Sequence, residues 1–157
     1  MAVVHEFLAH QEERTISLRE VANKIVRQTR QGMLDPEKRI HIDLTGTDVL
    51  LSAQQATSCA LIMNELLLNS IEHGFEGRSN GTITVELADS GASVTISVKD
   101  DGTALPADFN VEQVGSLGLQ IVRTLVQDDL KGTFQLENLD SGVHAIVSFP
   151  KNSSGGD

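Results

Sequence analysis

The sequence predicts an α+β fold, a two-layer α/β sandwich whose helices cover one face of a mixed, mostly antiparallel sheet. Stretches with the 3.6-residue periodicity of helices occur together with stretches of alternating apolar residues, which are typical of strands. Two pairs of these strands are joined by short turns and therefore read as hairpins. The 157 residues, 39% of them hydrophobic, suffice for one domain with its own core.

The first half of the chain contains three predicted helices and one strand. A short helix is expected over residues 2–13. A second follows, with Ser17 and Glu20 as a capping box and Gly32 and Pro36 at its end. Residues 39–46, RIHIDLTG, alternate in polarity and predict a strand. A long helix then runs from Ser52, a plausible N-cap, to Gly74.

The second half predicts two hairpins separated by a loop and a helix. Residues 81–89 and 93–100 alternate in polarity on either side of the turn DSGA. Residues 100–116 form a long loop of the kind that often serves as a lid or binding loop. A helix over 117–130 and a hairpin over 132–150, turning at 140–142, complete the fold. Residues 151–157 are expected to be a disordered tail.

The composition excludes several classes of function. A formal net charge of -10 and an aromatic content of 3%, with no Trp or Tyr, argue against binding to nucleic acid or to an anionic membrane surface. No stretch is long and apolar enough to span a bilayer, and the N-terminus does not resemble a signal peptide, so a cytoplasmic location is expected. Cys59 cannot form an intrachain disulfide and is interpreted as a small buried hydrophobe.

The long central helix carries an unusual set of polar residues. On a helical wheel, Glu65, Asn69, Glu72 and His73 share one stripe, while most other residues from 59 to 73 are apolar. A helix that is apolar nearly all round is buried, so this stripe predicts a cavity or a ligand. The alternative is the solvent-facing stripe of an ordinary amphipathic helix, and this helix alone does not decide between them.

Two further motifs favour a nucleotide site. Asp100-Asp101-Gly102 follows a strand, where a carboxylate can accept from an amino group and glycine permits close approach; the alternative is a plain turn. Gly115-Ser116-Leu117-Gly118 leads into a helix whose N-terminus can bind anions; the alternative is a flexible loop before a helix. Neither a Walker A sequence nor a G-x-G-x-x-G motif occurs.

In order and spacing, these three motifs resemble the N, G1 and G2 boxes of the ATPase fold of histidine kinases, gyrases, Hsp90-type chaperones and MutL proteins. Within that superfamily, residues 39–150 are most similar to sensor histidine kinases of the HisKA_2 type. The words that carry the resemblance are SAQQATSCALIMNELLLNSIEHGF, VKDDGTALP, SLGLQIVRTLV and a final hairpin ending in VSFP. The resemblance implies a Bergerat-type ATP-binding fold.

The resemblance also implies a role for each matching residue. Glu65 would be the acid that polarises the attacking group, and Asn69 would bind Mg²⁺ through its amide oxygen. Asp100 would accept from the adenine amino group, and Gly102 would let the base approach. The remaining ATP-binding residues would be His73 beside the nucleotide and the lid and helix start formed by Gly115, Leu117, Gly118 and Leu119.

At three positions the sequence departs from the family pattern. The second glycine of the G1 box is Ala104, and Glu72 stands where members often carry lysine. The last hairpin, GVHAIV, lacks a threonine that many members place near the adenine. The resemblance therefore leaves room for a weak or conditional ATPase.

Residues 1–35 resemble the end of a dimerisation module, and residues 36–150 would be the catalytic domain. The phosphoacceptor histidine would lie outside this chain, with a response regulator as the next partner. His5 lies in the word AVVHEFLA and is interpreted as a surface or packing residue. Two alternatives stay open: an anti-sigma-factor-like serine kinase of the same fold, and an interaction module that has lost its chemistry.

Overall fold

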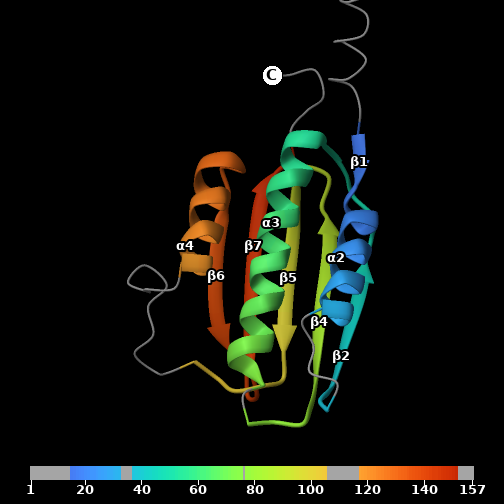
Figure 1. The fold of residues 1–157 in the computed structure, drawn as a ribbon. Coiled ribbons are helices and arrows are strands. Elements are labelled where there is room, and N and C mark those ends of the chain that lie inside the picture. Colours follow the sequence, from blue (N-terminus) through green and yellow to red (C-terminus); the bar gives the residue numbers. More distant parts are fainter. Residues whose placement is uncertain (1–14, 33–36, 76, 106–116, 152–157) are drawn as a thin grey trace, which may run out of the picture.

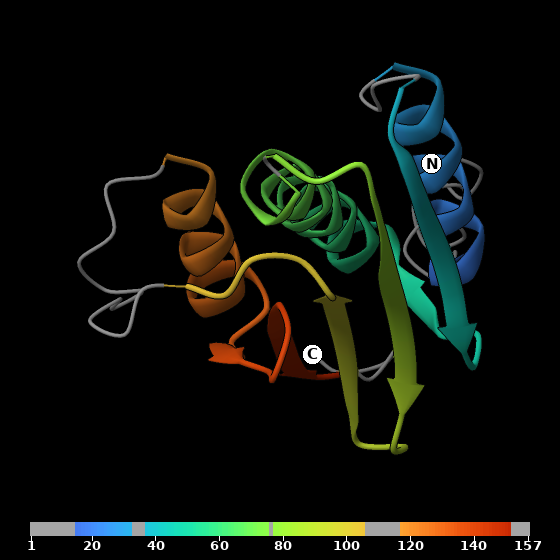
Figure 2. The same cartoon turned by 90° about the horizontal axis from the view of Figure 1, so that it is seen from below.

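The computed structural model describes residues 15–32, 37–75, 77–105 and 117–151. The predicted helix over 2–13, the tail 152–157 and most of the loop before α4 lie outside these residues. Figure 1 shows helices α2, α3 and α4 in front of a five-stranded sheet, and Figure 2 shows the same two layers from below. The predicted two-layer α+β sandwich, with its helices on one face of the sheet, is confirmed.

The large sheet has the strand order β2-β4-β5-β7-β6. Its strands are β2 (Arg39–Gly46), β4 (Asn80–Asp89), β5 (Ser93–Asp100), β6 (Thr133–Asn138) and β7 (Val143–Pro150). The β2–β4 pair is parallel and the other three pairs are antiparallel. Parallel neighbours need a long crossover, and helix α3 (Ala53–Asn69) supplies it. Both predicted hairpins, β4–β5 and β6–β7, are confirmed.

Helix α3 occupies the centre of the helical layer, between α2 (Leu18–Gly32) and α4 (Leu117–Thr124). The predicted N-cap is confirmed, since the Ser52 hydroxyl accepts from the Gln55 N–H at 3.2 Å. The helix changes at Ser70 to a π-helical turn, η1 (Ser70–Gly74), so it ends at the predicted glycine. Its apolar surface packs on the sheet through Cys59, Ile62, Met63, Leu66 and Leu67, all of which are buried.

Helix α2 shares the core of the domain. Its Leu18, Ala22 and Val26 side chains are buried in the same hydrophobic cluster as the α3 and sheet residues. Ser17 caps the helix, since its hydroxyl accepts from the Glu20 N–H at 3.2 Å. The predicted domain boundary after residue 35 stays a prediction. Residues 18–32 pack in the same two-layer sandwich as α3 and the sheet.

Two short strands were not predicted from the sequence. Strand β1 (Thr15–Ser17) pairs antiparallel with β3 (Leu50–Ser52), bringing the starts of α2 and α3 together. Helix α4 continues into a second π-helical turn, η3 (Leu125–Asp129), so the predicted helix over 117–130 is confirmed with a change of pitch near its end.

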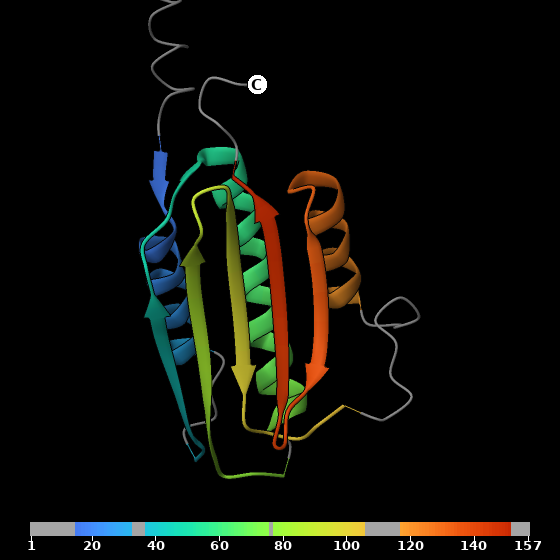
Figure 3. The same ribbon diagram turned by 180° about the vertical axis from the view of Figure 1, so that it is seen from behind.

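The sheet has one face that no described helix covers (Figure 3), and its edge strand β2 is contacted by arginines of α2. Figure 3 shows the face opposite the helices, which no described helix covers. At the β2 edge, the Arg39 N–H donates inward to Ser79 O at 2.7 Å, so the even-numbered carbonyls point outward. Two arginines of α2 reach these carbonyls. Arg19 Nη2 donates to Gly46 O at 2.8 Å, and Arg30 Nη2 donates to Ile42 O.

Candidate functional site

A cavity of about 390 Å³ opens between the end of α3, the sheet and the start of α4. This volume is within the range of about 300–1,000 Å³ typical of small-molecule sites. The side chains that line it are mostly apolar. The lining residues are Leu66, Asn69, Ser70, His73, Gly74, Val98, Asp100, Thr103, Ala104, Leu105, Leu119, Leu136, Val143 and Ala145.

Asp100 is the buried charged group of this cavity, with only 5% of its surface exposed. It is the last residue of β5, and its Oδ1 accepts from the Gly102 N–H at 2.9 Å and from the Val143 N–H at 3.3 Å. The Ser70 hydroxyl also donates to this carboxylate. Three elements therefore fix the carboxylate: its own turn, the β6–β7 hairpin and the π-helical turn.

Burial raises the pKa of the Asp100 carboxyl above its ordinary value of 3.8, and the charge of Asp101 contributes in the same direction. The hydrogen bonds from Gly102, Ser70 and Val143 oppose the rise because they stabilise the ionised form. A desolvated carboxylate held in this way is a strong hydrogen-bond acceptor for a ligand in the cavity.

Asp101, the second acid of the motif, has a structural role. Its Oδ1 accepts from the Thr82 N–H at 2.9 Å, which ties the turn to the start of β4. Its carbonyl accepts from Arg78 Nη1 at 2.9 Å and from the Ser141 hydroxyl at 2.8 Å. The two neighbouring carboxylates thus differ in role: Asp100 lines the cavity, and Asp101 is bonded to the start of β4.

Glycines allow the segments around Asp100 to approach closely. A Cβ on Gly102 would lie 2.1 Å from Gly74 O, so the turn after β5 packs directly on the end of η1. The Thr103 N–H donates to the same Gly74 carbonyl at 2.8 Å. Gly142, in the β6–β7 turn, has a φ of +95°, and a Cβ there would lie 1.9 Å from Asp100 O. Substitution of either glycine would therefore displace the backbone of the site.

Residues 103–105, which follow the turn after β5, are held in place by Asn138 of β6. The Leu105 N–H donates to Asn138 Oδ1 at 2.9 Å, and Asn138 Nδ2 donates to Leu105 O at 3.2 Å. Thr103, Ala104 and Leu105 all line the cavity. Ala104, which stands in place of the second glycine of the G1 pattern, is accommodated there with its surface exposed.

Asn69 and His73 lie on the helical wall of the cavity, next to Ser70 and Gly74, which contact Asp100. They are four residues apart, and both line the cavity, where Asn69 is half-buried and His73 is exposed. The structure gives the Asn69 carboxamide no hydrogen-bond partner among the described residues. Its oxygen is therefore available to a ligand or to a cation, since amide oxygens suit Mg²⁺.

The remaining predicted residues that the structure describes do not line this cavity, except for Leu119, which is buried in its wall. Glu65 is half-buried one turn before Asn69 and is not among the described lining residues. Leu117 begins α4 and is 70% exposed, followed by the half-buried Gly118. Gly102 supports the wall through its contact with Gly74. Gly115 lies outside the described residues.

Several residues of the site were missed by the sequence analysis. Val98 follows the inward alternation of β5 and could have been found from it. Val143 and Ala145 of β7 also line the cavity. Ser70 and Gly142 carried no signal of their own, because their roles depend on contacts with Asp100 from distant parts of the chain.

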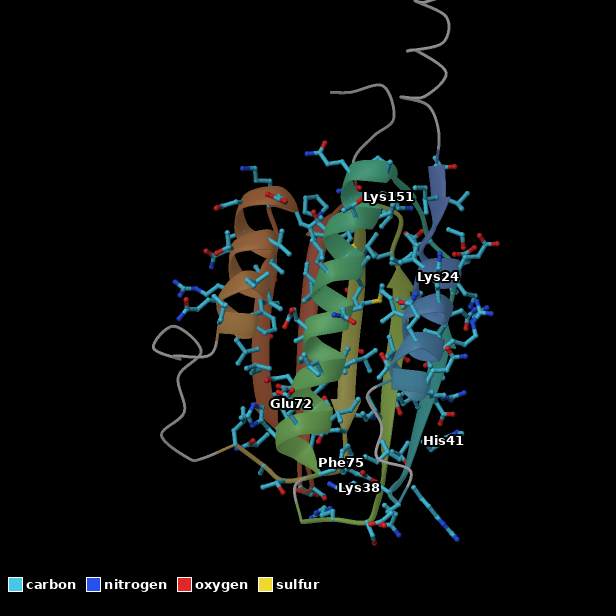
Figure 4. All side chains as sticks on the ribbon, in the orientation of Figure 1. Lys24, Lys38, His41, Glu72, Phe75 and Lys151 are labelled. Carbon is cyan, nitrogen blue, oxygen red and sulfur yellow. The ribbon has the colours of Figure 1, made fainter. Side chains whose placement is uncertain are left out.

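The basic side chains around the end of α3 are engaged elsewhere. In Figure 4, Lys38 lies beside Phe75 at the end of η1, and its Nζ donates to Phe75 O at 2.8 Å.

No described helix is long and apolar enough to cross a membrane. Among the described residues, no group of three or more His, Cys, Asp or Glu side chains could hold a metal ion.

Comparison with known proteins agrees with this geometry. Residues 54–153 match the family described as histidine kinase-, DNA gyrase B-, and HSP90-like ATPase. The chain belongs to this family. The match covers α3 from its second residue, the described residues that line the cavity and the final hairpin, and it supports ATP use by the domain.

Individual relatives are kinases of two kinds. Sensor histidine kinase PdtaS of Mycolicibacterium smegmatis is 32% identical over 148 residues, which cover 94% of this chain and 30% of PdtaS. Serine-protein kinase RsbW of Listeria monocytogenes is 28% identical over 102 residues, 56% of this chain and 61% of RsbW. The chain thus spans less than a third of the length of PdtaS.

A solved structure shares the fold. The histidine kinase domain of the Erythrobacter litoralis EL346 blue-light activated histidine kinase superposes with a TM-score of 0.70 at 26% identity. The superposition covers 85% of this chain and 59% of that domain. This chain therefore has the fold of a histidine kinase ATPase domain.

Proposed function

We propose that this chain is the ATP-binding catalytic domain of a two-component sensor histidine kinase. The observation that carries the proposal is the buried Asp100 carboxylate in a mostly apolar cavity that the uncommitted Asn69 carboxamide also lines. An apolar slot with one buried acceptor suits a purine that presents an amino group. The similarity to PdtaS over 94% of the chain adds support.

Each group of the cavity has a place in this proposal. Asp100 accepts from the adenine amino group, while Val98, Leu119 and Val143 contact the apolar faces of the base. Asn69 holds Mg²⁺ through its amide oxygen, and phosphate oxygens and water complete the coordination, because Mg²⁺ takes only one or two protein ligands in such sites. When bound, the ion supplies counter-charge to the phosphates. His73, Leu117 and Gly118 are assigned to the phosphate end in this proposal, and Gly115, predicted for the same role, lies outside the described residues.

Phosphoryl transfer depends on positioning and charge stabilisation more than on covalent catalysis by the protein. In this proposal Glu65, one turn from Asn69, polarises the attacking group at the rim of the cavity. The acceptor is a histidine of a dimerisation and phosphoacceptor module, and a response regulator receives the phosphoryl group from it. We propose a cytoplasmic location for the domain.

A serine kinase of the RsbW type is the second candidate, because RsbW is 28% identical to this chain over 102 residues. That similarity covers 56% of the chain, compared with 94% for PdtaS, so it omits much of what the histidine kinase relative shares. The two candidates differ in the acceptor: incubation with ATP and a phosphoacceptor module would label histidine in one case and a partner's serine in the other.

Calorimetry with Mg-ADP tests the proposal directly. The wild-type chain should bind Mg-ADP, and Asn69→Ala should lose most of the Mg²⁺-dependent part of the affinity. An unchanged affinity in Asn69→Ala would contradict the metal role of the carboxamide.

A second variant tests recognition of the base. Asp100→Asn replaces an acceptor by an amide that can turn its donor toward the ligand. It should weaken ATP by roughly tenfold or more, as expected for a mispaired buried polar group. Inosine triphosphate presents a carbonyl at the same position of the base, so its affinity should fall much less. Equal losses for ATP and inosine triphosphate would contradict base recognition by Asp100.

A further inference from the structure

The distribution of charge around the cavity has a consequence for the phosphate tail of a nucleotide, and this inference rests on the proposed function. Asp100 is buried inside the cavity. A nucleotide whose adenine reaches Asp100 must therefore extend its phosphates toward the exposed end of the cavity. That end is formed by His73 of η1 and by Thr103 and Ala104, all of which are exposed.

Lysine and arginine are absent from the described residues that line this cavity. Lys38 Nζ is bonded to the Phe75 carbonyl and Arg78 Nη1 to the Asp101 carbonyl, so these two basic groups are engaged by backbone carbonyls. A di- or triphosphate at the open end therefore finds no fixed cation among the described lining residues. A mobile cation must neutralise most of its charge.

Glu72 adds negative charge at this end. It is exposed, lies in η1 directly before His73 and follows Asn69 by three residues. Figure 4 shows Glu72 at the lower end of α3, on the side of that helix nearer to α4. None of the ion pairs found among the described residues involves it. Its charge is therefore unneutralised beside the two side chains that we place near the phosphates.

We propose that Glu72 is a specificity-determining residue that increases the dependence of nucleotide binding on a divalent cation. The carboxylate repels free ADP or ATP at the mouth of the cavity, and this repulsion largely disappears when the phosphates arrive as the magnesium complex. The site thereby selects the metal-bound nucleotide, the form that phosphoryl transfer requires, over the free nucleotide.

The size of the effect follows from Coulomb's law in water. Residues three apart on a helix are about 5–6 Å apart at Cβ, so a separation of about 8 Å from the phosphates is a fair working distance. At physiological salt, removing one unit of negative charge there should tighten free ADP by about two- to threefold, and reversing it by about five- to tenfold. Mg-ADP carries less charge and should change by about twofold at most.

Calorimetry with ADP, in EDTA and in excess Mg²⁺, tests this in the whole chain. Glu72→Gln and Glu72→Lys are compared with Glu86→Lys, which makes the same charge reversal at an exposed position of β4. Glu72→Lys should bind free ADP about five- to tenfold more tightly than wild type and bind Mg-ADP nearly unchanged, with Glu72→Gln between them. Glu86→Lys should leave the ratio of the two affinities unchanged.

The outcomes separate this inference from the function on which it rests. If wild type binds Mg-ADP but Glu72→Lys behaves like Glu86→Lys, Glu72 does not set the cation dependence and only the further inference is overturned. If wild type binds neither form of ADP, the nucleotide site itself is wrong and both are overturned. Far-UV circular dichroism of each variant confirms that the comparison is made between folded proteins.

Discussion

Gly142 offers the sharpest test of how the fold holds Asp100. Alanine at this position would place its Cβ 1.9 Å from the Asp100 carbonyl oxygen and 2.8 Å from Asp100 Oδ1, in a backbone with a φ of +95°. Gly91, in the β4–β5 turn, has a φ of +96° and nothing within 4 Å of the same ideal Cβ. The two alanine variants share the backbone strain and differ in the steric contact.

The positive φ alone should cost each variant about 1–2 kcal/mol. Displacing packed backbone costs Gly142→Ala a further 1–3 kcal/mol or so. For a chain of this size, each kcal/mol lowers the melting temperature by about 2–4 °C. Gly142→Ala should therefore melt roughly 2–12 °C below Gly91→Ala.

Differential scanning calorimetry measures the two melting temperatures, and titration calorimetry measures the affinity for Mg-ADP. Gly142→Ala should also lose affinity, because the displaced carbonyl belongs to the base-recognition residue, whereas Gly91→Ala should bind as wild type does. Equal melting temperatures and equal affinities in the two variants would refute the idea that the β6–β7 turn fixes the site.

Two further predictions concern the same carboxylate and its surroundings. Because the folded-state pKa of Asp100 is raised above 3.8, its contribution to stability is fully present below that pH and is lost as the pH rises through the folded-state pKa. In urea unfolding across a pH series, wild type should accordingly lose stability relative to Asp100→Asn as the pH rises from about 3.8, and parallel profiles would contradict the raised pKa. Asn138→Ala removes both hydrogen bonds to Leu105, so it should weaken Mg-ADP by roughly three- to tenfold. The exposed Asn138 should matter little to the melting temperature, and a large drop without loss of affinity would point to a purely structural role.

Much of the fold could be predicted because its signals are local. The apolar surface of α3, the cap at Ser52 and the alternation of β4 and β5 each depend on residues close together in sequence. Strands β1 and β3 could not be predicted, because each has three residues and gains its pairing only from a partner more than thirty positions away. Three residues are too few to show alternation.

The candidate site was predictable to a similar degree. Asn69, His73 and Asp100 were selected by spacing and do line one cavity. The wall of the cavity, however, includes Leu66 and Ser70, so it is turned relative to the predicted stripe, and Glu65 lies beside it. An ideal helical wheel could not show this, because the position of the sheet and the change of pitch at Ser70 decide which side chains face the cavity.

The arginines at the β2 edge bear on how this domain behaves at high concentration. An exposed edge strand can template a strand of a second molecule, and Arg19 and Arg30 occupy two of the carbonyls that such a strand would need. Pairing two molecules through their β2 strands would first require both guanidinium groups to break their hydrogen bonds to these carbonyls. Helix α2 therefore protects the β2 edge from pairing with another strand, while it also contributes to the core.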